Sequence, residues 1–119
     1  MEESIKEGLI RAGVNVEELN NRIMGNETLI FHFLKQFLKD ENYTTLVSSM
    51  DCDDVEGAFH AAHTLKGVCG NLSLQSLSKE VCPLVEDLRN GDIEAAREKM
   101  PEFKKVYTQL IEDLEHLLP

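Results

Sequence analysis

Residues 92–117 read DIEAAREKMPEFKKVYTQLIEDLEHL, and this stretch decides the fold class. Its apolar residues recur at steps of three and four, which places them along one side of a helix. They are Ile93, Ala96, Met100, Phe103, Tyr107, Leu110, Leu114 and Leu117. Asp92 is the expected N-cap, and Pro101, which lacks a backbone donor, predicts a kink or a restart. The stretch therefore predicts a long amphipathic helix that buries one face.

Earlier segments show the same helical spacing of apolar residues. They cover residues 15–25, 26–37, 43–50, 55–68 and 74–88, of which the second and third form either one helix or two. The expected N-caps are Asn15, which forms a capping box with Glu18, then Asn26, and either Asp53 or Asp54. Asn90-Gly91 is a stop signal, and Pro83 is a second helix breaker inside the segment 74–88.

The whole pattern predicts an all-α fold. No stretch shows the sustained alternation of a strand, and no Pro/Gly/Ser-rich linker or repeat divides the chain. A chain of 119 residues also has room for one hydrophobic core only. We therefore expect a single domain over residues 1–119, an antiparallel four-helix bundle with a short additional N-terminal helix.

The chain is acidic, with 12 Lys and Arg against 22 Asp and Glu, a formal net charge of −10. Such a field repels the phosphates of nucleic acids and the surfaces of anionic lipids. We therefore expect neither nucleic acid nor a membrane among its partners. The hydrophobic fraction of 42% is ordinary for a folded protein and argues against disorder.

The cysteines and the first residues indicate a cellular location. Cys52, Cys69 and Cys82 lack the paired spacing of a zinc site or of a secreted disulfide framework, so a reducing compartment fits best. The start, MEESIKEG, is acidic where a signal peptide would be basic and then apolar. No apolar run approaches the ~20 residues of a membrane helix. We expect a cytoplasmic protein.

The segment 55–72 separates into two faces when each residue is advanced by about 100° around a helix axis. The face expected to pack in the core carries Val55, Ala58, Ala61, Ala62, Leu65, Val68, Cys69 and Leu72. The opposite face carries Phe59, His60, His63, Lys66, Gly67 and Gly70. His63 is therefore expected to point away from the core.

Two glycines on this outer face need a reason, because each costs ~1 kcal/mol relative to alanine inside a helix. Such positions indicate that another backbone or a ligand approaches closely. Gly67 leaves open space above the imidazole of His63, and Lys66 places an ammonium on the same flank. Lys66 is also the only Lys or Arg in residues 40–78. A nucleophilic imidazole, a nearby cation and a cleared surface suit the transient holding of a phosphoryl group.

The stretch Ala62-His63-Thr64-Leu65-Lys66-Gly67, followed by Gly70-Asn71-Leu72, resembles the signature of histidine-containing phosphotransfer (Hpt) domains. In that family a helical bundle exposes one phospho-accepting histidine followed by Lys-Gly, and most of this chain is similar in order and spacing. The resemblance implies that His63 accepts the phosphoryl group, that Lys66 stabilises its charge and that Gly67 lets a partner approach. The residues expected at the docking surface are Phe59, His60 and Gly70.

The resemblance also implies a partner. An Hpt domain is no catalyst by itself, so the chain would be a phosphoryl carrier of a multistep two-component phosphorelay rather than an enzyme. Its partner would be the receiver domain of a response regulator or a hybrid sensor histidine kinase. The receiver supplies the acidic pocket and Mg²⁺, so no cofactor is expected on this chain, which we expect to be a monomer.

The chain departs from the family pattern at two places. Val68 and Cys69 follow the Lys-Gly pair, where family members often have small Ser or Ala, and both are expected to face the core. Some members place a Gln or Glu on the neighbouring helix to orient the histidine, at a position that corresponds to Val85 here. The resemblance therefore provides no hydrogen-bond partner for His63.

Three other interpretations remain open. Glu56, His60 and His63 step along one helix and offer three metal ligands, although the Glu-x-x-His pairs of di-iron bundles are absent. A non-catalytic helical adaptor, or an Hpt-like interaction module without phosphotransfer, would use the same fold. A hydrolase is disfavoured, because no Ser/His/Asp or Cys/His set falls on one surface. His32 and His116 are expected to be solvated or half-buried positions without chemistry.

Overall fold

The computed structural model describes residues 1–119, which form seven helices and no sheet. The helices are α1 (Glu3–Arg11), α2 (Val16–Arg22), α3 (Glu27–Phe37), α4 (Asn42–Asp51), α5 (Val55–Asn71), α6 (Gln75–Arg89) and α7 (Ile93–Leu117). Val14 and Leu74 form one isolated β-bridge. None of the helices has the length and hydrophobicity needed to span a membrane. The predicted all-α class is confirmed.

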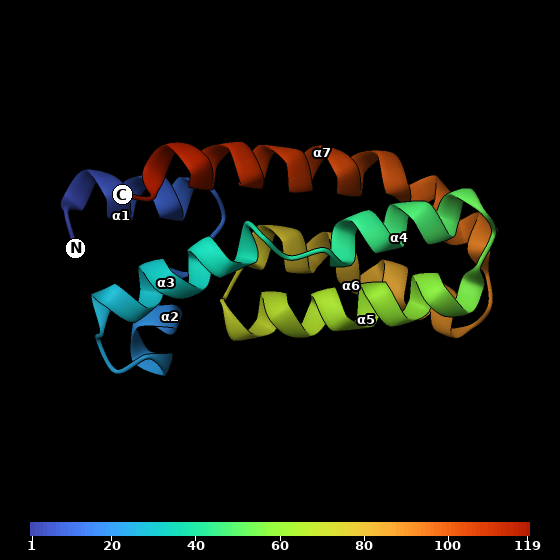
Figure 1. Cartoon of the computed structure of the whole chain (residues 1–119), viewed down its shortest axis with the longest axis horizontal. Helices are drawn as coiled ribbons and strands as arrows, with labels where there is room; N and C mark the ends of the chain where they lie inside the picture. The colour runs from blue at the N-terminus through green and yellow to red at the C-terminus, as the bar shows by residue number, and fades with distance from the viewer.

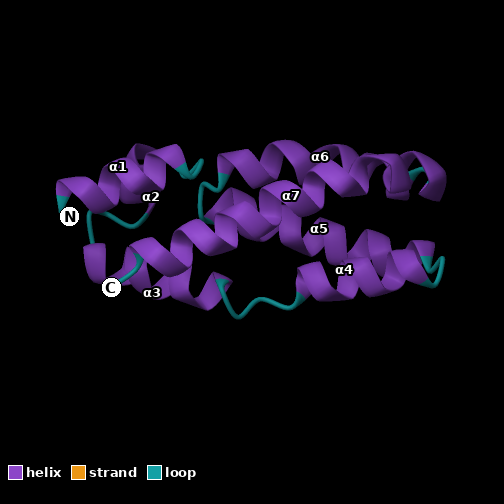
Figure 2. Cartoon of the chain, turned by 90° about the horizontal axis from the view of Figure 1, so that it is seen from above, coloured by secondary structure: helices purple, strands orange, loops and turns teal.

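Helices α4 to α7 form the bundle. They lie side by side, and each packs against the next one along the chain (Figure 1). Short connections reverse the chain direction between neighbours, so the bundle is antiparallel, as predicted. The molecule is elongated, with principal extents of 44, 23 and 20 Å. Helix α7 runs along most of this length, as Figures 1 and 2 show from two directions.

The first three helices cover one end of the bundle. Helix α1 packs against α7, and α2 contacts both α1 and α3 (Figure 1). Helix α2 is the short N-terminal helix that the capping pattern predicts, whereas α1 is not predicted. It has no side-chain N-cap, and its placement depends on a contact with the other end of the chain. Gly8 lies against Leu117, and a Cβ at Gly8 would collide with that side chain.

The predicted N-caps are confirmed at four helices. The side-chain oxygens that accept the backbone N–H three residues further on belong to Asn15, Asn26, Asp54 and Asp92, at 2.9–3.1 Å. Each such cap contributes about 1 kcal/mol. Asp54 rather than Asp53 caps α5, and the carboxylate of Asp53 pairs instead with Arg97 of α7.

Residues 38–41 separate α3 from α4, so the open choice between one helix and two is decided in favour of two. The carboxylate of Asp40 accepts the backbone N–H of Asn42 at 2.9 Å and also its side-chain amide. Such a local side-chain turn competes with continued helix formation.

Both internal prolines lie within continuous helices. Pro83 is inside α6 and Pro101 inside α7, so the restart allowed for the last helix at Pro101 does not occur. Pro101 is exposed, whereas its neighbours Met100 and Phe103 are buried. Packing on both sides of the proline holds the helix together, although one backbone hydrogen bond is missing.

Every helix contributes to one hydrophobic core, and two ionisable groups lie in or beside it. The ring of Tyr107 stacks on Tyr43 with centroids 3.8 Å apart, and burial together with the negative charge of Asp40 raises its pKa to about 12. Burial, with a smaller effect of Cys82, raises the pKa of the Cys69 thiol to about 12. Both groups are therefore neutral in the folded protein well above neutral pH.

The two raised pKa values predict loss of stability in alkali. The unfolded chain releases these protons near the ordinary values of 9.0 and 10.0, whereas the folded chain keeps them up to about pH 12. The contribution of these two neutral groups to the free energy of unfolding is complete below about pH 9. It is lost as the pH rises through about pH 12. Urea unfolding should show this decline, and a Tyr107→Phe, Cys69→Ala double variant should show a weaker one. An unchanged decline in the double variant would contradict this assignment.

Candidate functional site

The core face of α5 is as predicted. Its buried residues are Ala58, Ala61, Ala62, Leu65, Cys69 and Leu72, the last next to the helix end, whereas Val55 and Val68 are half-buried. This face packs between α4 and α6. The rotation of α5 about its axis is fixed by this burial, because fully burying one leucine contributes about 1.5–3 kcal/mol.

The opposite face of α5 carries the predicted site. His63 is exposed near the middle of the helix, and His60, Gly67 and Gly70 are exposed on the same side. Lys66 is half-buried. At about 100° per residue, Lys66 flanks His63 on one side and Gly67 flanks it on the other. The structure therefore brings these predicted residues together on one surface.

Phe59 connects this surface to the neighbouring helix. Its ring lies one turn before His63, with the two ring centroids 5.6 Å apart and the planes tilted by 32°. The guanidinium of Arg89, near the end of α6, lies 5.1 Å from the centroid of the same Phe59 ring. No sequence pattern indicates Arg89, because the contact joins two helices and residues 30 positions apart.

No hydrogen bond of the chain reaches the imidazole of His63. Val85, where some Hpt domains carry an orienting Gln or Glu, is fully buried in the core. Its apolar side chain offers no polar atom. Both ring nitrogens of His63 are therefore free of partners within the chain.

The glycines of α5 differ in what surrounds them. A Cβ added at Gly57 would collide with the carboxylate of Asp54, so Gly57 makes room for the N-cap of the helix. A Cβ at Gly67 or at Gly70 would meet no atom within 4 Å. The fold itself therefore gives no steric reason for glycine at these two outward positions.

Lys66 is the only Lys or Arg on α5, and Arg89 of α6 adds a second cation over the ring of Phe59. Lys66 forms no ion pair, and residues 40–65 contain six acidic residues and no Lys or Arg.

The Nε2 atom of His60 lies 3.8 Å from a carboxylate oxygen of Glu56. No group of three or more His, Cys, Asp or Glu side chains is close enough to hold a metal ion. The three ligands proposed for a metal site thus do not converge.

Histidines and cysteines elsewhere form no second site. His32 on α3 and His116 near the end of α7 are both exposed, and the ring of His32 meets the ring of Phe33 edge-on. Cys69 is buried, Cys82 is half-buried with its sulfur 3.7 Å from the Oγ of Ser78, and Cys52 is exposed.

Two apolar residues of α3 are partly exposed, although they were expected in the core. Leu29 and Phe33 are 38% and 40% exposed, although their spacing predicts burial. Phe33 lines an open groove of about 480 Å³ that extends to Val68, Asn71 and Leu72 at the end of α5. An apolar groove therefore runs beside the C-terminal part of the His63 face.

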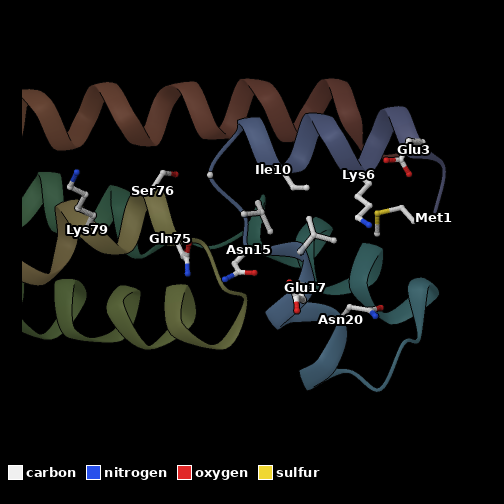
Figure 3. A pocket seen from close by; sticks show the side chains of 13 residues that line it. Met1, Glu3, Lys6, Ile10, Asn15, Glu17, Asn20, Gln75, Ser76 and Lys79 are labelled. Atoms are coloured by element: carbon white, nitrogen blue, oxygen red, sulfur yellow. The ribbon is translucent and has the colours of Figure 1, made fainter.

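The largest cavity, about 940 Å³, lies elsewhere, between α1, α2 and the start of α6 (Figure 3). Its wall includes Lys6, Asn15, Gln75 and Lys79, and none of the predicted site residues. His63 therefore lies outside this cavity, on an exposed face of α5. Such a face suits contact with the surface of another macromolecule.

The fold is a helical bundle that exposes His63 on an open face of α5. The family model of the Hpt domain matches residues 32–117, which include all of α4 to α7. The chain belongs to the Hpt domain family, whose members are phosphocarrier modules of two-component phosphorelays. No curated protein and no solved structure matches the chain.

Gly57 and Gly67 lie on the same helix, but their surroundings predict that substitution by alanine changes the stability of the fold in opposite directions. Gly67→Ala should raise the free energy of unfolding by about 0.5–1 kcal/mol, because alanine stabilises a helix interior and its methyl group meets no neighbour. Gly57→Ala should lower it, because the methyl group displaces the Asp54 cap. Urea unfolding of both variants measures the difference. A destabilised Gly67→Ala variant would show that the fold itself requires this glycine.

Proposed function

We propose that this chain is a histidine phosphotransfer protein in which His63 accepts a phosphoryl group from the phospho-aspartate of a receiver domain, or passes it to one. The observation that carries the proposal is an exposed imidazole on the central face of an Hpt bundle, next to an unpaired lysine and a glycine with open space around it. An adaptor without phosphotransfer has no need of that combination.

The chemistry requires little from this side of the interface. A neutral imidazole nitrogen of His63 attacks the phosphorus in line, the N–P bond forms, and the acyl phosphate P–O bond breaks. The aspartate leaves as a carboxylate, and the other ring nitrogen keeps its proton, so no acid or base is needed. Transfer depends mostly on positioning and on stabilising the phosphoryl charge. The receiver would bring Mg²⁺ and its own acidic pocket.

Lys66 and Gly67 take the two supporting roles. The ammonium of Lys66, one turn from His63, would stabilise the oxygens of the phosphoryl group by charge-assisted hydrogen bonds. Gly67 would let the receiver surface come close to the ring of His63, because a Cβ at Gly67 would meet no atom within 4 Å. Phe59, His60 and Gly70 would contact the receiver around this centre, with the groove beside Phe33 at its edge.

Phosphorylation by a receiver tests the proposal. When the chain is mixed with a phosphorylated receiver, a phosphate that is labile in acid should appear on the wild type and be absent from His63→Gln, because the proposal makes His63 the acceptor. The control is His116→Gln, which removes another exposed histidine near the end of α7 and should label like the wild type. Full labelling of His63→Gln would refute the proposal. Binding of the receiver without any labelling of the wild type would favour the adaptor.

A further inference from the structure

The imidazole of His63 lacks the usual means of being held in place. It lies on a solvent-exposed helix face and has no hydrogen bond from the chain. The torsion that turns a histidine ring about its last bond is broad when nothing restrains it. The aromatic contact with Phe59, four residues earlier on α5, is the one ring contact of His63. Residues four apart on a helix face each other, so this contact is built into α5 itself.

The ring of Phe59 is in turn held from the neighbouring helix. Phe59 is half-buried and packs against the core, and the guanidinium of Arg89 lies over its ring at 5.1 Å. Arg89 is itself restrained, since its Nε lies 3.4 Å from a carboxylate oxygen of Glu86 on the same helix. Arg89, Phe59 and His63 therefore form a continuous series of contacts from α6 to the imidazole.

We propose that Phe59, held by Arg89, is a positioning residue that fixes the ring plane of His63 for phosphoryl transfer. The proposal rests on the proposed function of His63. Val85, one turn before Arg89 on α6, is buried and apolar and cannot orient a ring nitrogen. The aromatic contact replaces a hydrogen bond here, and it restrains the ring while leaving both nitrogens unoccupied. Arg89 acts through Phe59 and not on the phosphoryl group.

A phosphoryl donor without a protein partner separates positioning from docking. Phosphoramidate can phosphorylate His63 directly: the imidazole nitrogen forms the new N–P bond, the N–P bond of the donor breaks, and ammonia leaves and takes up a proton as ammonium. The rate of this labelling reports on the imidazole and its immediate surroundings. Because no receiver is present, a change in the rate cannot come from a lost docking contact.

Phe59→Leu should lower the labelling rate about 3- to 10-fold, the range expected from losing an aromatic contact of this kind. Phe59→Tyr should restore the rate, because it keeps the ring. Arg89→Gln should also lower the rate, whereas Arg89→Lys, which keeps the cation, should lower it less. Arg22→Gln is the matched control, because Arg22 is equally exposed and pairs with a glutamate of its own helix, but its guanidinium lies over no aromatic ring. Circular dichroism and urea unfolding confirm that each variant is folded.

The double variant decides how Arg89 acts. If Arg89 works only by holding Phe59, then Phe59→Leu with Arg89→Gln should label at the rate of Phe59→Leu alone. A further loss in the double variant would show that Arg89 acts directly on the phosphoryl group and would overturn the proposal. The ring protons of His63 give a second readout, since Arg89→Gln should shift their NMR signals towards those of Phe59→Leu.

The outcomes separate this proposal from the proposed function. If phosphoramidate leaves wild-type His63 unlabelled, the role of His63 fails and the positioning role fails with it. If the wild type is labelled on His63 and Phe59→Leu is labelled equally fast, only the positioning role is overturned. Slower labelling of both single variants, without a further loss in the double variant, supports it.

Discussion

The burial of one face of α5 between α4 and α6 is the constraint on which the site depends. Small residues on this face, among them Ala58 and Ala62, let the neighbouring helices approach, and Leu65 fills the core between them. Turning α5 by one residue, about 100°, would bring charged or polar side chains into that core. The outward direction of His63 is therefore set by hydrophobic burial on the other side of the same helix.

Helices that do not carry the site hold the bundle, and with it α5, in place. Helix α7 runs along the bundle and packs against α6 and, through Leu117 and Gly8, against α1. Asp92 caps the start of α7, and the ion pair between Arg97 and Asp53 joins α7 to the loop that precedes α5. A carrier needs little more than this, because phosphoryl transfer depends on positioning, and a rigid helix positions a side chain more accurately than a loop does.

The features set by local pattern could be predicted from the sequence. The caps at Asn15, Asn26 and Asp92 follow from residue type and spacing, and the outward side of α5 follows from its apolar stripe. The features that the sequence pattern does not predict depend on tertiary contacts. Helix α1 needs Leu117, which is distant in the sequence, and α7 continues through Pro101 because both sides of it are packed. The contact of Arg89 with Phe59 required two helices to be placed side by side.

The exposed imidazole of His63, whose outward direction is fixed by the packing of α5, is the proposed carrier of the phosphoryl group. The most direct measurement is a phosphorus NMR spectrum of the chain after reaction with a phosphorylated receiver, with correlations from phosphorus to the histidine ring protons. We expect one phosphoramidate signal that correlates with the ring of His63. A signal that correlates with His32, His60 or His116, or a carboxyl phosphate on this chain, would contradict it.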